Sequence, residues 1–471
     1  MVNQFIITKY HREIPNNWNH VSIGSFYLTY DSSLSLCQLK SKNKIIGYFL
    51  GLPIHEDYGL LKGGHDDNLL QSLEKIESFL TKVSGRYIFL LNFEDYLRLY
   101  PDPGNTLSIV YSQKLKSISS NPLLINPKAL EQKDEFLFDN RSNNYIPFGL
   151  TSFKDIFRLL PNHYIDLKTW KVIRFFPSKD GSFEGFDNRN EFSDTVFNIL
   201  KNQLDHIISK YDQLYMTLTG GNDNRMMLCA GFDYIQNFIF FTNSRSKKID
   251  LHLVNKMRKG LGLKHYYIDY SITEKTEKIL EKEYISGYCA NSGMEKRIFH
   301  HRQQLPVKKN AIQLSGGGGE ILRNIYNPIS NNKTITPDRI VSLLFNDPKY
   351  KEYLLANYKY LLEDWLNELY GMSLTNFQIM KLLYWEFDFG CRPGPNMYLI
   401  DEYTFPVIQM FNSWKIINIG LNNYPPEKGN NMANQIMKDY CPSLSKYPIN
   451  NYSDIRKHLV NIAKFIKKRY L

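Results

Sequence analysis

The chain has 471 residues, of which 43% are hydrophobic and 22% are charged, a balance that excludes a largely disordered protein. This length exceeds what one hydrophobic core usually organises, so we expect two domains. The cysteines lack CxxC spacing and are odd in number, which argues against a disulfide framework or a zinc site and favours a reducing cytoplasm. They are Cys37, Cys229, Cys289, Cys391 and Cys441.

The formal net charge is +11, and part of it lies in residues 456–471, which read as a basic amphipathic helix. Nucleic acid or an anionic membrane would suit such a face, but a solvated helix flank explains it more simply. We therefore expect no nucleic-acid partner. The N-terminus lacks a basic head with a long apolar core, and no run approaches the roughly 20 apolar residues that span a bilayer. We expect neither export nor membrane insertion, and a cytoplasmic protein.

Short strand-like runs separated by turn residues fill residues 1–177, which we take as the first domain. The last of them, at 157–177, reads as a hairpin. Residues 178–190 are polar, contain two glycines and have little to bury, so they are expected to form a linker.

Helical and strand patterns alternate from residue 191 onward, which predicts a parallel sheet with packed helices in a second domain at 191–471. A helix is expected at 191–210, then strands ending at Thr219 and at Asn243, with a further helix and strand over 248–270. Beyond Thr336 the pattern is mainly helical, with a proline- and asparagine-rich tail at 418–452.

The stretch LTGGNDNR, residues 218–225, follows an apolar strand and precedes a helix. In an open α/β sheet, ligands bind where strands end, and a helix N-terminus offers backbone N–H groups to an anion. Gly220 and Gly221 would let the backbone approach a phosphate, and Asp223 would hold Mg²⁺ beside it. The spacing matches neither GxxxxGK[ST] nor GxGxxG, and a plain structural turn is the alternative.

A second glycine cluster repeats this order of elements. The apolar run Ala311–Leu314 precedes four consecutive glycines, Gly316–Gly319, and then Glu320. Four glycines lose considerable chain entropy on folding, so close backbone approach explains them better than an ordinary loop. Together the two clusters favour a binding site.

The segment LTGGNDNR resembles the SGGxDS pyrophosphate-binding motif of the asparagine synthetase family, and SGGGGEILR resembles that family's second glycine-acid motif. Residues 84–112 and 153–167 are similar to strands of its glutaminase-type domain. The resemblance implies an α/β and α+β protein. Its N-terminal domain would be an Ntn-hydrolase-like αββα sandwich. Its C-terminal domain would be an ATP-pyrophosphatase (adenine nucleotide α-hydrolase-like) parallel sheet with extra helices.

Three departures from the family pattern change these expectations. Glutamine-hydrolysing members begin Met-Cys, whereas this chain has Val2, which lacks a nucleophilic atom. We therefore expect no glutaminase activity and a retained scaffold, as in the β-lactam synthetase branch. The last Ser of the first motif is Asn224, and the usual Asp-Glu pair of the second has become Glu320-Ile321.

The resemblance implies that ATP and a carboxylic acid give an acyl-adenylate and pyrophosphate, after which an amine displaces AMP. Asp223 and Glu320 would bind Mg²⁺, and Glu320, Arg323 and Lys446 would be catalytic. Arg225 would also lie near the phosphates. For Arg225 and Arg323, a salt bridge is an equally good or better explanation than a role in binding or catalysis. For Lys446, the simpler explanation is a solvated surface lysine. The ATP-binding set would be Leu218, Thr219, Gly220, Gly221, Asp223, Asn224, Arg225, Thr242, Gly316 and Gly317.

For several other side chains, a structural explanation stands beside the functional one. His300 and His301 are adjacent, so on a helix they point about 100° apart and do not share one metal. Glu295 lies where related enzymes place substrate-facing residues. In the segment 385–394, Arg392 falls where the family approaches its acceptor site, although core packing also explains the segment.

We carry three functional hypotheses. The first is an ATP-dependent amide-forming ligase acting on a small-molecule or peptide carboxylate with ammonia or an amine, as in polysaccharide or peptide modification. The second is a catalytically degenerate member of the same family that binds nucleotide or a partner protein. The third is an interaction protein acting through its basic C-terminal helix.

Overall fold

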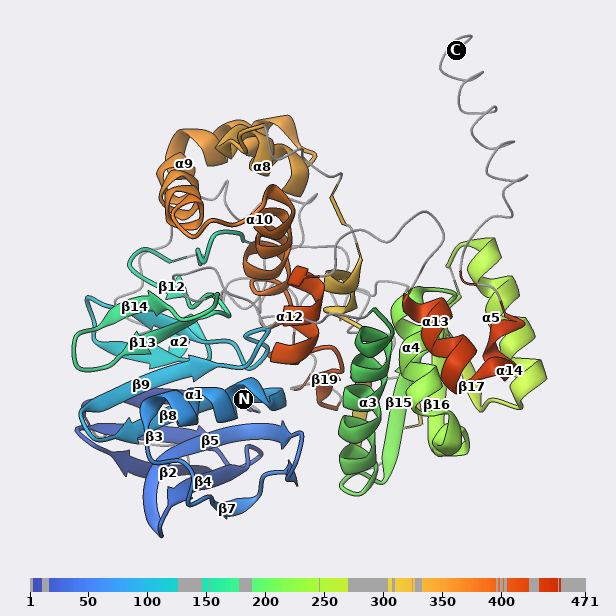
Figure 1. Cartoon of the computed structure of the whole chain (residues 1–471), viewed down its shortest axis with the longest axis horizontal. Helices are drawn as coiled ribbons and strands as arrows, with labels where there is room; N and C mark the ends of the chain where they lie inside the picture. The colour runs from blue at the N-terminus through green and yellow to red at the C-terminus, as the bar shows by residue number, and fades with distance from the viewer. Residues whose placement is uncertain are drawn as a thin grey trace.

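The protein is mixed α/β, with three β-sheets in the part of the chain that its computed structural model describes (Figure 1). The N-terminal sheets occupy one side of the molecule and the third sheet the other. None of the helices described is both long and apolar enough to cross a membrane. The described residues are 3–10, 17–125, 146–151, 153–177, 189–244, 246–269, 304–306, 310–323, 325–326, 333–394, 397–398, 401, 405–422, 432–447 and 449.

Two largely antiparallel sheets are built from the first 174 residues. The six-stranded sheet has the order β12-β10-β11-β1-β3-β2, and the larger one has the order β14-β13-β9-β8-β5-β4-β7, with β6 beside β5. Their strands are β1 (Phe5–Thr8), β2 (Trp18–Ile23), β3 (Phe26–Asp31), β4 (Leu36–Ser41), β5 (Lys44–His55), β6 (Gly59–Leu60), β7 (Gly63–Asp66), β8 (Val83–Phe93), β9 (Tyr96–Pro101), β10 (Val110–Ser112), β11 (Ser117–Ser119), β12 (Phe157–Arg158), β13 (His163–Asp166) and β14 (Lys171–Arg174). The hairpin expected at 157–177 is β13–β14.

Alternating apolar residues let these two sheets pack face to face. Phe5 and Leu28 of the smaller sheet share one core with Leu50 and Leu90 of the larger sheet. Helix α1 (Leu73–Thr81) covers the outer face of the larger sheet, and the short α2 (Pro122–Ile125) packs on the smaller one. The described N-terminal part therefore has helices outside two stacked sheets.

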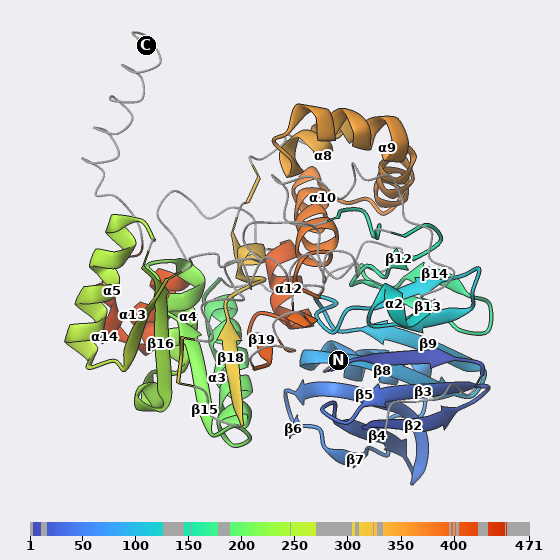
Figure 2. The ribbon, with the colours of Figure 1, turned by 180° about the vertical axis from the view of Figure 1, so that it is seen from behind.

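The third sheet has five parallel strands in the order β17-β16-β15-β18-β19. From β15 the chain moves outward to β16 and β17, then returns to place β18 on the other side of β15, as Figure 2 shows. The strand order thus reverses between β15 and β18, which is where such sheets bind ligands. The strands are β15 (Gln213–Thr217), β16 (Phe238–Asn243), β17 (His265–Ile268), β18 (Ala311–Ser315) and β19 (Val407–Gln409).

Helices cover this sheet and extend from it. In Figure 1, α3, α4 and α13 lie over one face, and α8, α9 and α10 form a separate helical group. Helix α10 runs directly into η4, a π-helical turn. The bounds are α3 (Arg189–Ile208), α4 (Asn222–Ala230), η2 (Phe232–Asn237), α5 (Lys248–Leu261), η3 (Gly319–Leu322), α8 (Pro337–Leu344), α9 (Pro348–Tyr370), α10 (Asn376–Leu383), η4 (Tyr384–Phe389), α12 (Trp414–Asn422), α13 (Met432–Tyr440) and α14 (Pro442–Ser445).

The described part of the chain beyond Thr336 is mainly helical, as expected. It also contains β19, which was not expected because its three residues are too few to show a strand period. The proline- and asparagine-rich tail expected at 418–452 contains the end of α12 and all of α13. Ile416 and Ile419 of α12 are fully buried, so apolar packing overrides the weak helix propensity of the intervening Asn418. The expected linker, 178–190, lies almost entirely outside the described residues.

A buried ion pair joins the N-terminal sheets to the C-terminal helices. Glu386 of η4 has no exposed surface, and its carboxylate accepts two hydrogen bonds from the Arg174 guanidinium of β14. Its remaining donors are Trp365 Nε1 of α9 at 2.8 Å and Asn162 Nδ2 at 2.9 Å. One carboxylate therefore connects three separate segments.

We predict that Glu386→Gln lowers the free energy of unfolding by about 3 to 5 kcal/mol, because it leaves Arg174 buried without its balancing charge. Glu368→Gln is the matched control, since Glu368 also contacts Arg174, at 3.1 Å, but is 42% exposed. The control is expected to cost less than about 1 kcal/mol. Urea unfolding measures both, and equal losses would contradict the role given to burial.

Candidate functional site

The two glycine turns meet at the carboxyl edge of the third sheet. One turn follows β15 and leads into α4, and the other follows β18 and leads into η3. A Cβ on Gly316 would lie 3.0 Å from Asp223 Cβ, and one on Gly319 would lie 2.6 Å from Asp223 Oδ1. Only residues without a side chain let the second turn pack this closely on the start of α4.

Hydrogen bonds hold the first turn in one shape. Thr219 Oγ1 accepts from Gly221 N at 3.2 Å and from Asn224 Nδ2 at 2.9 Å, and the same amide donates to Thr217 O at 2.7 Å. Asn224, where the family motif has a serine, thus closes the turn. Gly221 caps α4 without a side chain, so the helix N-terminus carries no side-chain cap.

Thr242 and Leu218 are buried beneath this turn and support it through a hydrogen bond. The Thr242 hydroxyl donates to Leu218 O at 2.7 Å and lies 2.8 Å from His265 Nε2. Burial, followed by the nearby Arg258, lowers the pKa of His265 to about 4, so the ring is neutral at pH 7. Both predicted binding residues are buried supports of the turn, with their side chains below its surface.

Asp223, Glu320 and Arg323 form one charged cluster. The Arg323 guanidinium donates to both Asp223 oxygens, at 2.8 and 3.0 Å, and lies 3.6 Å from Glu320 Oε1. Burial raises the pKa of Asp223 to about 6 and outweighs the lowering effect of Arg323. The structure therefore brings three predicted site residues together, with the arginine between the acids.

Two further residues of this cluster were missed in the sequence. Tyr384 of η4 donates its hydroxyl to Glu320 Oε2 at 2.9 Å. Lys381 of α10 is almost fully buried, and its ammonium donates to Ile321 O and, at 2.7 Å, to Arg323 O. Burial, followed by repulsion from Arg323, lowers the pKa of Lys381 to about 7. The sequence signal for Lys381 is its position inside the apolar run 377–385. A lysine buried in such a run is rare unless it has partners, so its position indicates a specific role.

The middle glycines of the second turn accommodate neighbouring side chains. A Cβ on Gly317 would lie 2.4 Å from Gln409 Oε1, and one on Gly318 would lie 2.8 Å from the Phe389 ring. Gly318 also has a φ of 90°, which a side chain would strain. The four glycines are thus explained by close packing as well as by the backbone approach that a ligand requires.

Two predicted residues are not part of the cluster. Arg225 is fully buried on the opposite side of α4, where its guanidinium contacts Met257 Sδ of α5. Lys446 is exposed beside Tyr447, whose hydroxyl packs on Gly260 near the end of α5. The end of α5 leads into the start of β17, so Lys446 lies at the amino edge of the sheet, away from both glycine turns.

Of the other residues considered for a functional role, the structure describes only Arg392. Arg392 Nε lies 3.3 Å from Asp388 Oδ1, one helical turn away. Glu295, His300 and His301 lie outside the described residues, as does the basic segment 456–471.

The carboxylates at the glycine turns could hold Mg²⁺ only together with phosphate oxygens and water. Asp223 and Glu320 are the carboxylates that the turn sequences themselves supply, and Asp250 Oδ1 accepts a hydrogen bond from Gly220 N at 3.3 Å. The described residues contain no group of three or more acids, histidines or cysteines that would hold a metal. Mg²⁺ commonly takes one or two carboxylates, waters and substrate phosphates. These residues therefore fit an ion that arrives with a polyphosphate.

Comparisons with known proteins assign no family. No family model matches the chain, and no curated protein matches it. Among solved structures, NMN synthetase from Francisella tularensis matches with 13% identity over 52% of this chain and 100% of that chain, at a TM-score of 0.21. A TM-score this low is insufficient to relate the two folds.

We predict that Gly319→Ala destabilises the protein by about 1 to 3 kcal/mol, because the new methyl overlaps Asp223 Oδ1 while Arg323 pins that carboxylate. Gly221→Ala is the matched control in the other turn, where the nearest atom is 3.4 Å away. It is expected to cost less than about 1 kcal/mol. Guanidinium unfolding measures both, and an equal cost would show that the turns are not in contact.

Lys381 makes the free energy of unfolding depend on pH. The unfolded chain keeps the lysine proton up to a pKa of 10.5, whereas the folded protein loses it at about 7. The unfolded state therefore binds more protons between these values, and stability rises with pH across this window. From pH 7 to 9.5 we expect Lys381 to contribute an increase on the order of 2 to 3 kcal/mol.

Lys381→Met is expected to lose this contribution, while Lys359→Met, which removes an exposed lysine of α9, keeps it. Denaturant unfolding of the parent and both variants at pH 7 and pH 9.5 measures the difference. The same pH dependence in the parent and in Lys381→Met would refute the low pKa.

Proposed function

We propose that the protein is an ATP-dependent ligase of the asparagine synthetase type, which adenylates a carboxylic acid and transfers the acyl group to an amine or ammonia. The observation that carries the proposal is the meeting of both glycine turns between β15 and β18, where the strand order reverses. An acid from each turn lies in one cluster there with Arg323.

The two stacked N-terminal sheets support the finer architecture in this proposal. They would be the remnant of an Ntn-hydrolase-like αββα domain, and the parallel sheet would be the ATP-pyrophosphatase domain. The N-terminal domain would serve as a scaffold, because Val2 replaces the nucleophilic cysteine. The amine would then come from solution or from a substrate.

The nucleotide would lie with its polyphosphate over the N-terminus of α4. Gly220 and Gly221 leave that surface without side chains, and the helix dipole favours an anion there. Mg²⁺, held by Asp223 and Glu320 together with the phosphates, would supply charge neutralisation. Arg323, with 38% of its side chain exposed, would turn from the carboxylates toward the phosphates.

In the reaction, a carboxylate oxygen of the substrate attacks the α-phosphorus, and the bond to pyrophosphate breaks. The amine nitrogen then attacks the acyl carbon, the bond to AMP breaks, and the nitrogen loses a proton. Arg323 would stabilise the charge that develops on the departing pyrophosphate. Lys381 would be a positioning residue, since its ammonium holds the carbonyls of Ile321 and Arg323 and thereby orients η3.

One observation favours the degenerate alternative. Arg323 is already paired with both carboxylates, and Ile321, which is buried, stands where the usual pair has its second acid. A protein that kept the fold but lost catalysis would have such an internally paired site. This alternative retains nucleotide or partner binding without adenylation.

We predict that ATP with Mg²⁺ stabilises the protein, by about 2.7 kcal/mol at a hundredfold excess over the dissociation constant. Asp223→Asn is expected to remove most of the accompanying rise in Tm, because it removes the carboxylate beside the phosphates. Asp364→Asn, on the exposed side of α9, is the matched control and should retain it. Differential scanning fluorimetry with and without Mg²⁺ measures the shift.

A folded parent without any ATP-dependent shift would overturn nucleotide binding. Exchange of labelled pyrophosphate into ATP, assayed with pools of carboxylic acids, separates the two proposals. Exchange that Glu320→Gln reduces by at least about a hundredfold supports the ligase. ATP binding without exchange in any pool supports the degenerate alternative.

A further inference from the structure

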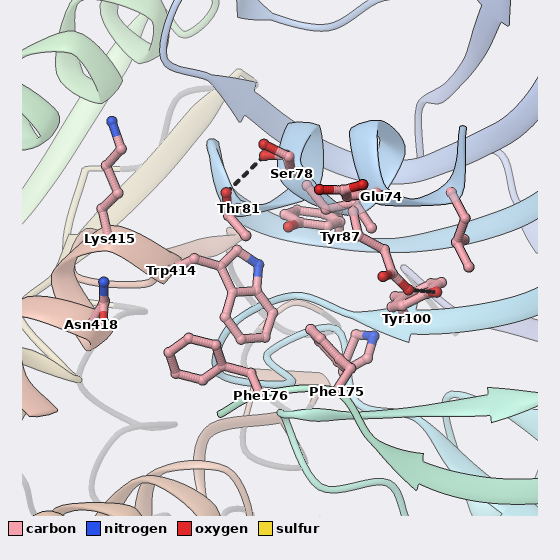
Figure 3. Close-up of a pocket in the computed structure, with 14 residues that line it drawn as sticks. Glu74, Ser78, Thr81, Tyr87, Tyr100, Phe175, Phe176, Trp414, Lys415 and Asn418 are labelled. Carbon is pink, nitrogen blue, oxygen red and sulfur yellow. Dashed lines mark hydrogen bonds between the residues drawn. The ribbon is translucent and has the colours of Figure 1, made fainter. Parts of the chain in front are cut away.

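A cavity of about 570 Å³ lies between α1 and the start of α12, apart from the glycine turns (Figure 3). Its lining includes Tyr87, Tyr100, Phe175, Phe176 and Trp414. Small-molecule sites are typically cavities of about 300 to 1,000 Å³ with mostly apolar and aromatic walls. The cavity therefore has the size and lining of a ligand site.

α12 separates this cavity from the nucleotide-site candidate. Trp414, Lys415 and Asn418 of α12 line the cavity, whereas Gly420 packs against Ile321 of η3. Asp223, Glu320 and Arg323 are absent from its lining. A ligand in the cavity would thus be a different molecule from the nucleotide.

The aromatic wall is held rigid by its neighbours. The Trp414 ring packs edge-on against Phe175, with centroids 5.2 Å apart, and against the buried Trp385 at 5.7 Å. Phe176 also packs on Trp414, at 6.1 Å. Rings fixed in this way lose little side-chain entropy when a ligand binds.

The opposite wall carries the polar groups. Glu74, Glu77, Ser78 and Thr81 line the cavity at positions three, four and seven residues apart, so they share one face of α1. The other face of α1 packs on the sheet through residues such as Ile76. Figure 3 shows this helix face across the cavity from Phe175 and Phe176.

Negative charge predominates in the lining. Glu77 Oε1 is paired with Arg98 at 3.0 Å and accepts a hydrogen bond from Tyr100 at 2.7 Å, and no described contact uses Oε2. Glu74 is the lining carboxylate that has no cationic partner among the described contacts. Lys415, the cationic lining residue, is paired with Glu56. A cationic group therefore suits the cavity better than an anionic one.

We propose that this cavity binds an amphiphilic organic amine. Its aromatic or branched apolar body lies among Tyr87, Phe175, Phe176 and Trp414, and its ammonium group lies against Glu74 and Glu77. Charge-assisted hydrogen bonds to carboxylates and attraction to aromatic faces both favour a cation here. This binding is independent of the proposed ligase activity.

The test compares two probes with the same ring and similar chain length but opposite charge, tryptamine and indole-3-propionate. Isothermal titration calorimetry on the full chain is expected to give at least tenfold tighter binding of tryptamine. Glu74→Gln and Glu77→Gln should each weaken tryptamine by about tenfold, because each loses one charged contact. Glu352→Gln, on exposed α9, removes the same charge elsewhere and should change nothing.

Location is tested by filling the cavity. Thr81→Trp adds an indole at an exposed helix position that lines the cavity, so the fold is expected to survive while tryptamine binding falls at least tenfold. Circular dichroism confirms folding of each variant. No tryptamine binding, equal binding of both probes, or binding that Thr81→Trp leaves unchanged would each overturn the proposal.

Discussion

The buried carboxylate of Glu386 is the interaction on which the arrangement of the molecule depends. It receives hydrogen bonds from β14, α9 and the loop before β13, and it lies in η4, which continues α10. The same continuous segment carries Lys381 and Tyr384 to the second glycine turn. The N-terminal sheets therefore help to position the candidate site.

The placement of that site could be predicted from the sequence, because its signals are local. A buried apolar run followed by glycines and an acid marks the end of a strand and the start of a helix, and it occurs twice, at 213–223 and 311–320. Parallel strands end at the same edge of a sheet, so two such turns converge when their strands are neighbours. β15 and β18 are adjacent, although almost a hundred residues separate them.

The partners of the site could not be read in the same way, because they depend on packing between distant segments. Lys381 and Tyr384 contact η3 from the helical segment that also carries Glu386, whose own partners lie in β14, in α9 and in the loop before β13. Arg225 follows the motif directly in sequence, but two positions along a helix turn a side chain about 200°, from the exposed side of α4 toward α5. The assignment of Lys446 to the site rests on a loose resemblance alone, without a local sequence signal.

The ion pairs that Arg323 forms with Asp223 and Glu320 affect the free energy of binding of any charged ligand at this site. Asp223 and Glu320 share its positive charge, which offsets their mutual repulsion in a partly buried setting. Within the proposed function, a divalent cation that binds alone would displace the guanidinium from the carboxylates and leave it without a partner. The net free energy of binding would therefore be small. A cation arriving with ATP supplies phosphates that the released guanidinium can bind. Every charge then keeps a partner, and the exchange favours joint binding of nucleotide and metal over binding of either one alone.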